Sequence, residues 1–351
     1  MTRIRLGPYL RQLALLLVLV ASCTSVLEAD EADPPEDLKR LEISGLMFGD
    51  AYWVASHHDP TAEGIVSAWI RRGYLIFDSE LTKRLSGRIG FELNQNGDFD
   101  VFEFTGDIRD LYLQTAIGKH RVLFGLSKTP TFNLIESFWG YRYVERTPLD
   151  VQGIASRDTG IAANGPIARD GSISYRAMLG TQLEFGNDSS DSGKWMGAIS
   201  FEPNSHWVIE LYADFEHPKR QLNDRLTLQT FFGYKTDSAR FGLQYSNQDR
   251  GTDPGLEIAS FFAISDFAKR WSFLSRVDRL FEPSVRGEDI AYLPFDPDAN
   301  ATLLILGVEA RPYEFFSLVP NIEYIHYDDP PGPEPRPEND LLVRLTFNLT
   351  F

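Results

Sequence analysis

Cysteine and long apolar runs are both scarce in this sequence of 351 residues. Cys23 is the only cysteine, so no disulfide bond can form within one chain. After residue 30, no stretch approaches the roughly 18 continuous apolar residues that a membrane-spanning helix needs. The sequence therefore argues against a protein that crosses a membrane with helices.

Positive charge is also low. The chain has 34 Lys and Arg against 50 Asp and Glu, a net charge of −16. Nucleic acid is not an expected partner, because phosphate binding requires clustered lysines and arginines. Four segments that we expect to be outward loops carry −14 of this charge: residues 94–107, 184–194, 282–299 and 328–340. Such loops are expected to meet lipid headgroups and lipopolysaccharide.

Alternating patterns and aromatic residues, by contrast, are plentiful. Aromatics make up 13% of the chain, and apolar and polar residues alternate in short runs from Leu41 onward. In the last run, residues 341–351, one face is wholly apolar and the other nearly wholly polar. Sixteen strands are expected, at roughly residues 41–57, 65–81, 84–95, 107–118, 120–128, 157–165, 172–183, 195–202, 206–217, 225–235, 239–247, 256–266, 271–281, 300–311, 315–327 and 340–351.

The even number of strands and the alternation of short and long connections predict an all-β fold, a closed antiparallel transmembrane β-barrel. Two alternatives stay open. One is a secreted soluble β-sandwich that binds a ligand, and the other is a closed outer-membrane barrel with a structural or adhesive role. No helical period persists anywhere in the chain.

The first forty residues are expected to lie outside the barrel. Residues 1–29 have the pattern of an export signal, with three arginines before an apolar run at Leu13–Ala21. Cleavage is expected after Ala29, or alternatively Cys23 becomes a lipidated first residue. Residues 30–40 are an acidic, proline-containing periplasmic lead-in, and residues 41–351 form the barrel.

One connection, residues 128–156, is much longer than the others, and loops of that length are usually functional. It is the third outward loop, and we expect it to fold into the lumen as a constriction. From Lys128 to Arg157, four positive groups outnumber three negative ones, which predicts a weak preference for anions unless the charges pair with each other. The expected constriction residues are Lys128, Glu136, Arg142, Glu145, Arg146, Asp150 and Arg157.

Three blocks around this loop resemble the phosphate-selective porin O and P family. They are Gly125-Leu-Ser-Lys128-Thr-Pro130, Glu145-Arg146 and Ser156-Arg157-Asp158-Thr-Gly160, and residues 71–74 and 320–322 are similar to that family too. The resemblance implies a trimeric, sixteen-stranded porin of the Gram-negative outer membrane that lets small hydrophilic solutes diffuse passively. Phosphate selectivity in that family depends on inward arginines and many lysines. Because this chain is acidic, we expect no tight phosphate site.

Arginines on the expected strands should point into the lumen, because a lipid-facing arginine costs about 2–4 kcal/mol at the bilayer midplane. The expected lumen-wall residues are Arg71, Arg176, Arg225, Arg240 and Arg344. They could form a basic strip. Alternatively, each pairs with an inward carboxylate such as Asp110, Glu210, Asp214 or Glu257, which would leave a mixed polar lining.

The remaining expectations concern the ends of strands. Phe351 ends the last alternating run, the pattern that the barrel assembly machinery reads. The neighbouring His57 and His58 fall at a strand end, where we expect a solvated surface pair and no metal. No catalytic grouping and no cofactor are expected.

Overall fold

The computed structural model describes residues 41–351, apart from 100–101, 155, 182–192, 219–222 and 331–334. The predicted export signal at residues 1–29, Cys23 and the lead-in at residues 30–40 lie outside the described residues. Among the described residues, no helix is long and apolar enough to cross a membrane.

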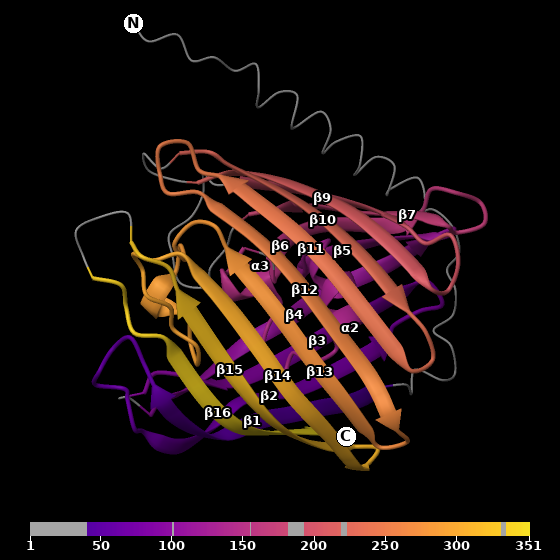
Figure 1. Ribbon diagram of the computed structural model, residues 1–351. Helices are drawn as coiled ribbons and strands as arrows, with labels where there is room; N and C mark the ends of the chain where they lie inside the picture. Colours follow the sequence, from indigo (N-terminus) through magenta and orange to yellow (C-terminus); the bar gives the residue numbers. More distant parts are fainter. Residues whose placement is uncertain (1–40, 100–101, 155, 182–192, 219–222, 331–334) are drawn as a thin grey trace, which may run out of the picture. The chain divides into compact units, whose positions relative to one another are not determined.

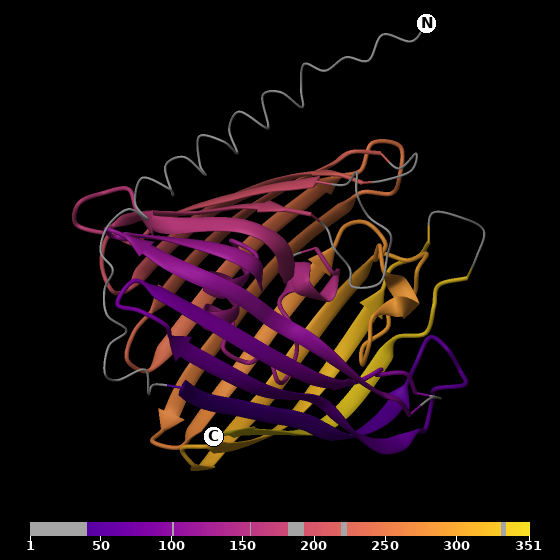
Figure 2. The same cartoon turned by 180° about the vertical axis from the view of Figure 1, so that it is seen from behind.

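Sixteen antiparallel strands form one closed barrel, in which each strand pairs with the next along the chain and β1 pairs with β16 (Figures 1 and 2). All sixteen predicted runs are strands in the structure, which confirms the predicted fold. Their bounds are β1 (Leu41–Ser56), β2 (Val66–Glu80), β3 (Leu85–Gln95), β4 (Phe104–Ile117), β5 (His120–Lys128), β6 (Arg157–Pro166), β7 (Ile173–Gly180), β8 (Gly193–Phe201), β9 (Trp207–His217), β10 (Arg225–Lys235), β11 (Ala239–Asp249), β12 (Leu256–Ala268), β13 (Trp271–Leu280), β14 (Ala301–Tyr313), β15 (Phe316–Tyr327) and β16 (Asp340–Thr350).

The two faces of the sheet differ as the alternation predicts. On β9, Ile209 and Leu211 are 40% and 57% exposed on the outside, whereas Glu210 and Tyr212 are buried inside. Large apolar side chains are exposed in the same way on most other strands. Soluble proteins rarely expose so large an apolar surface. A single closed sheet also contradicts the β-sandwich alternative, which needs two sheets packed face to face.

Connections at the two ends of the barrel alternate along the chain, and those at one end include all the long ones. We number this set L1 (57–65), L2 (96–103), L3 (129–156), L4 (181–192), L5 (218–224), L6 (250–255), L7 (281–300) and L8 (328–339). A turn of only two to six residues follows each even-numbered strand from β2 to β14, from 118–119 after β4 to 167–172 after β6.

L3 contains two helices, α2 (Phe132–Trp139) and α3 (Pro148–Val151), although we predicted no helix. The apolar face of α2, which includes Ile135 and Phe138, is buried. Gly140 ends the helix with a φ of 73°, a left-handed conformation that glycine adopts without a steric penalty. Eight residues are too few for a helical period to stand out from the alternating strands around them.

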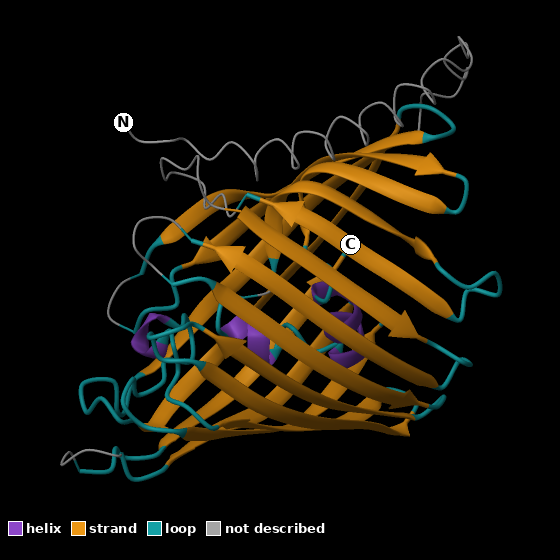
Figure 3. Ribbon diagram, turned by 90° about the horizontal axis from the view of Figure 1, so that it is seen from above, coloured by secondary structure: helices purple, strands orange, loops and turns teal. Residues whose placement is uncertain are grey.

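The largest apolar cluster of the molecule lies inside the barrel. It joins buried side chains of L3 and L7 to the inner faces of β9, β10 and β12–β16. On β14, for example, Leu303 and Ile305 point inward and are no more than 1% exposed. Figure 3 shows the helices among the strands. One side of the interior is therefore packed like a protein core.

Candidate functional site

The position of L3 follows from its contacts with strands that lie far apart around the barrel. Thr131 donates a hydrogen bond to Glu210 on β9 at 2.6 Å, and the hydroxyl of Tyr141 donates to Glu309 on β14 at 2.9 Å. Arg71 of β2, on another part of the wall, reaches the carbonyl of Val144 at 2.6 Å. L3 therefore lies within the barrel.

Three of the predicted constriction residues hold L3 in shape. Arg142 forms ion pairs with Glu136, at 2.9 Å, and with Asp150. Glu136 also accepts two hydrogen bonds from Thr147, both at 3.1 Å. Burial disfavours the charged guanidinium, but Asp150 and Glu136 offset this effect and hold the pKa of Arg142 well above its usual value. These three charges pair with each other, which is the alternative that we gave to an anion-preferring loop.

Two further predicted residues anchor L3 to the wall. The Glu145 carboxylate is fully buried and accepts from Arg71 at 2.8 Å and from the Arg146 side chain at 3.1 Å. Burial favours the neutral acid, but Arg71 and Arg146 outweigh it and hold the pKa of Glu145 well below its usual value. Arg71 also lies 3.5 Å from Asp50. Arg71 is therefore a structural anchor, and does not line an open lumen.

L7 also enters the barrel, contrary to our expectation of an outward acidic loop at residues 282–299. Its residues Ile290, Leu293 and Phe295 are at most 1% exposed and belong to the inner apolar cluster. L7 contacts L3 directly, because Arg146 donates to the carbonyl of Ala291 at 3.0 Å. Those three apolar side chains of the loop are buried, whereas the acidic Glu288 and Asp289 are exposed. The net charge of the loop therefore does not predict whether its backbone lies inside or outside the barrel.

Tyr292 is the residue of L7 that reaches across to the first strands. Its amide donates to the carbonyl of Gly97 in L2 at 2.9 Å, and its hydroxyl donates to the carbonyl of Arg71 at 2.8 Å. Arg344 donates to its carbonyl oxygen. Tyr292 has a φ of 72° and is the only non-glycine residue with a positive φ among the described residues. Such a conformation costs about 1–2 kcal/mol, so packing must hold it in place.

The other predicted wall arginines also have partners. Arg344 is fully buried and lies 3.0 Å from Glu323, and Arg225 lies 3.2 Å from Glu216. Arg240 donates to the carbonyl of Trp139 at 3.1 Å. Arg176 pairs with Glu210, as the mixed-lining alternative predicted.

Two of the predicted carboxylate partners have other roles. Asp214 lies 3.4 Å from Lys194. Glu257 accepts from the hydroxyl of Tyr245, which is 44% exposed on the outer face, so the prediction that Glu257 points inward is wrong. On β12, as on β11, the even-numbered residues point inward, and the pairing register of the two strands is needed to establish this.

A row of cations lines the part of the wall that the apolar cluster does not cover. Each of six consecutive strands contributes one. The six residues, which we call the basic wall, are Arg72 on β2, Arg88 on β3, Arg109 on β4, Lys128 on β5, Arg157 on β6 and Arg176 on β7.

The basic wall is only partly neutralised. Asp110 lies 3.1 Å from Arg157 and 3.8 Å from Arg109, and Asp78 lies 2.7 Å from Arg88. Lys128 has no ion pair among the described residues. Among the described residues, a buried nitrogen atom of each of Arg109, Arg157 and Arg176 has no hydrogen-bond partner, and the same is true of Arg142 in L3.

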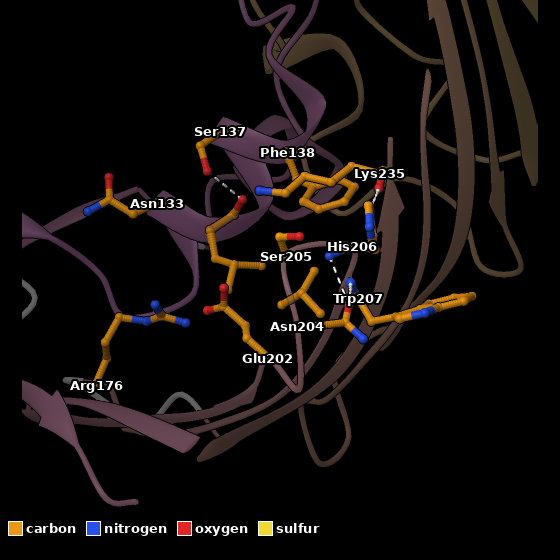
Figure 4. A pocket seen from close by; sticks show the side chains of 12 residues that line it. Asn133, Ser137, Phe138, Arg176, Glu202, Asn204, Ser205, His206, Trp207 and Lys235 are labelled. Atoms are coloured by element: carbon orange, nitrogen blue, oxygen red, sulfur yellow. Dashed lines mark hydrogen bonds between the residues drawn. The ribbon is translucent and has the colours of Figure 1, made fainter. Parts of the chain in front are cut away.

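Two cavities continue along this wall. One of about 120 Å³ is lined by Lys128, Arg88 and Asp110, and one of about 300 Å³ extends to the short turn after β8. Arg176 and Asn133 line both. In Figure 4, Arg176 and Lys235 approach the larger cavity from two sides, and the ring of Phe138 from α2 borders it. Polar space thus runs between α2 and the wall.

Comparison with known proteins supports the architecture. No protein-family model and no curated protein matches the sequence. Solved structures do match: an anion-selective porin from Comamonas acidovorans has 14% identity and a TM-score of 0.63, over 89% of this chain and 99% of that one. The outer membrane channel DcaP of Acinetobacter baumannii has 13% identity and a TM-score of 0.65, over 89% and 97%. Salmonella typhi OmpF has 8% identity and a TM-score of 0.63, over 90% and 98%.

The likeness is one of fold. At such identities the comparison establishes a sixteen-stranded barrel of the kind that outer-membrane porins have, and it leaves the choice of solute to the chain's own residues.

Sequence reasoning identified two members of the basic wall as site residues of the loop, Lys128 and Arg157, and one as a wall residue, Arg176. Arg109, and Arg72 as an alternative to Arg71, were among the strand arginines considered for an inward strip, whereas Arg88 was missed. A single arginine on a strand carries no signal of its own. Only the register of β2, β3 and β4 brings these three to one part of the wall.

Proposed function

We propose that this chain is a porin of the bacterial outer membrane through which small hydrophilic solutes diffuse passively, with a weak preference for anions. The observation that carries the proposal is the basic wall. It places one cation on each of six consecutive strands, and three of the six, Arg88, Lys128 and Arg176, line the cavities beside L3.

Local charge outweighs net charge in this proposal. Much of the excess negative charge belongs to the outer connections, and at physiological ionic strength a Debye length of about 8 Å screens exposed charges. Charges inside a narrow, protein-lined passage are screened less, and they act directly on a passing ion. Because Asp78, Glu92, Asp110 and Glu210 neutralise part of the basic wall, we expect a weak preference and no tight phosphate site.

Three other observations agree with this function. Lys128 and Arg157, which carry the resemblance to phosphate-selective porins, both belong to the basic wall. The solved structure from Comamonas acidovorans is itself named an anion-selective porin. The exposed apolar side chains around the barrel suit a lipid environment, in which every backbone group must be paired as a closed barrel pairs it. We propose that the protein assembles as a homotrimer, with Phe351 read by the barrel assembly machinery.

Planar-bilayer recording tests the proposal. Purified folded protein should give stable open steps, and a salt gradient should give a reversal potential of anionic sign. Lys128→Gln should move that potential toward cation preference. Lys269→Gln, which removes the same charge from an exposed turn, is the matched control and should change it little.

Three results would contradict the proposal in different ways. Clear cation selectivity of the unmodified protein would refute the role of the basic wall. Block by micromolar phosphate would show a tight site that we do not expect. Folded protein without any conductance would favour the closed structural or adhesive barrel.

A further inference from the structure

Two histidines and an aspartate meet where the barrel closes. His57 and His58 begin L1, and Asp340 begins β16. Each of the three offers a ligand atom that lies within 4.8 Å of those of the other two. Our expectation of a solvated histidine pair is wrong, because His57 is 2% exposed and the side chains of His58 and Asp340 are 5% and 0% exposed.

The contacts of this cluster leave one buried nitrogen without a partner among the described residues. The Nδ1 of His58 lies 2.9 Å from the Asp340 carboxylate, which also accepts from the Tyr327 hydroxyl at 2.6 Å. The Nδ1 of His57 accepts from the backbone of Asp59 at 3.0 Å. The Nε2 of His57 is buried and has no hydrogen-bond partner among the described residues. A buried polar atom without a partner is unfavourable, so it calls for a ligand or another explanation.

We propose that His57, His58 and Asp340 bind one divalent transition-metal ion of the Zn²⁺ class. Two imidazole nitrogens and a carboxylate oxygen are a ligand set that Zn²⁺ accepts, and three protein ligands leave a fourth position for water. Copper and nickel ions bind the same kinds of atom, so the shared chemistry is that of borderline transition metals.

Binding requires a small rearrangement of L1. Metal bonds of about 2.0–2.2 Å bring ligand atoms closer together than the present limit of 4.8 Å. An imidazole that binds through Nε2 carries its proton on Nδ1, so the hydrogen bond from Asp59 must be released. Asp59 is exposed, and water can replace His57 as the acceptor for its amide.

A bound ion would join the two ends of the barrel sequence. His58 and Asp340 are 282 positions apart, and β1 and β16 are the strands that complete the cylinder. The three ligands come together only in the closed barrel, so the ion stabilises the folded form by mass action. This inference does not depend on the proposed channel function.

Calorimetric titration of untagged, chelator-treated, folded protein with Zn²⁺ alone tests the site. We expect one equivalent to bind, and we expect His57→Ala and Asp340→Asn each to weaken binding at least about tenfold. His217→Ala is the matched control and should leave the affinity unchanged, because the ion pair of His217, at the end of β9, with Asp224 in L5 is exposed, at 65% and 52%.

A second measurement separates metal binding from loss of structure. Zn²⁺ should raise the unfolding temperature of the unmodified protein and of His217→Ala, but not that of His57→Ala. Absence of Zn²⁺ binding to the unmodified folded protein at ~100 µM would overturn the proposal, whatever the variants do. Equal binding by His57→Ala, Asp340→Asn and the unmodified protein would also overturn it, by moving the ion elsewhere.

Discussion

Replacing Tyr292 should release L7 from the first strands and widen the passage. Loss of a buried aromatic side chain costs about 3–5 kcal/mol, and the hydroxyl hydrogen bond to Arg71 contributes roughly 1 kcal/mol. Since every 1.4 kcal/mol is about a tenfold change in a population, a loss of about 3 kcal/mol makes a displaced L7 roughly a hundredfold more frequent. We expect Tyr292→Ala to raise open-channel conductance and current noise in planar bilayers.

The positive φ of Tyr292 makes the order of substitutions informative. Glycine adopts this conformation freely, whereas alanine retains a penalty of about 1–2 kcal/mol. Tyr292→Phe keeps the ring against Trp69 and Arg71 and loses only the hydroxyl. Noise should therefore increase from the unmodified protein through Phe and Gly to Ala.

Tyr313→Ala is the control for this series, because Tyr313 is 60% exposed outside the barrel. Unchanged conductance and noise in folded Tyr292→Ala would refute the role of L7 in the passage. Equal effects of Gly and Ala would refute the argument from backbone conformation.

Three further predictions follow from the ion pairs and the outer face. Arg142→Ala should destabilise L3 by about 3–5 kcal/mol, because it leaves the buried Glu136 and Asp150 carboxylates without a cation, and faster proteolysis at L3 than in Arg84→Ala, an exposed control, checks this. Because the folded pKa of Glu145 is depressed, its contribution to stability is present above the usual value of 4.5 and is lost only as pH falls through the lower, folded value. Any pH-dependent change in single-channel conductance that Glu145→Gln abolishes should thus lie below about pH 4.5, and such a change centred at or above about pH 4.5 would contradict this anchor. Leu211→Arg, on the outer face of β9, should cost about 2–4 kcal/mol in urea unfolding from lipid vesicles, while a change below about 0.5 kcal/mol would argue against lipid contact there.

The strands could be predicted because their cause is local. One face of each strand belongs to the apolar outer surface and the other faces the interior of the barrel. Alternation such as that of Ile209, Glu210 and Leu211 therefore appears within a few residues. The interior could not be predicted in the same way. On β14, residues 303–306 are apolar on both faces, a pattern typical of strands that are covered on both sides. This pattern was the one signal in the sequence that the interior is packed near β14. It does not indicate that L7 provides the packing, because that depends on how the strands are arranged around the barrel.

The candidate site depends on contacts between distant parts of the chain. The sequence supports charges at Lys128, Arg142 and Arg157, but it does not indicate that Arg142 is neutralised within L3 while Lys128 has no ion pair. His57 and His58 read as an ordinary surface pair for the same reason. Their burial depends on Asp340 and Tyr327 from the far end of the chain.

The packed interior also constrains how the protein reaches its final form. L3 contacts β2, which is made early in the chain, and L7 contacts both β2 and β16, which stand at opposite ends of it. Contacts of such long sequence separation carry a loop-closure cost, and the pairing of β1 with β16, which closes the cylinder, spans more of the chain than any of them. The contacts of L3 and L7 are therefore expected to form together with barrel closure. The apolar part of the interior then loses its water in the same step that pairs the two ends of the barrel sequence.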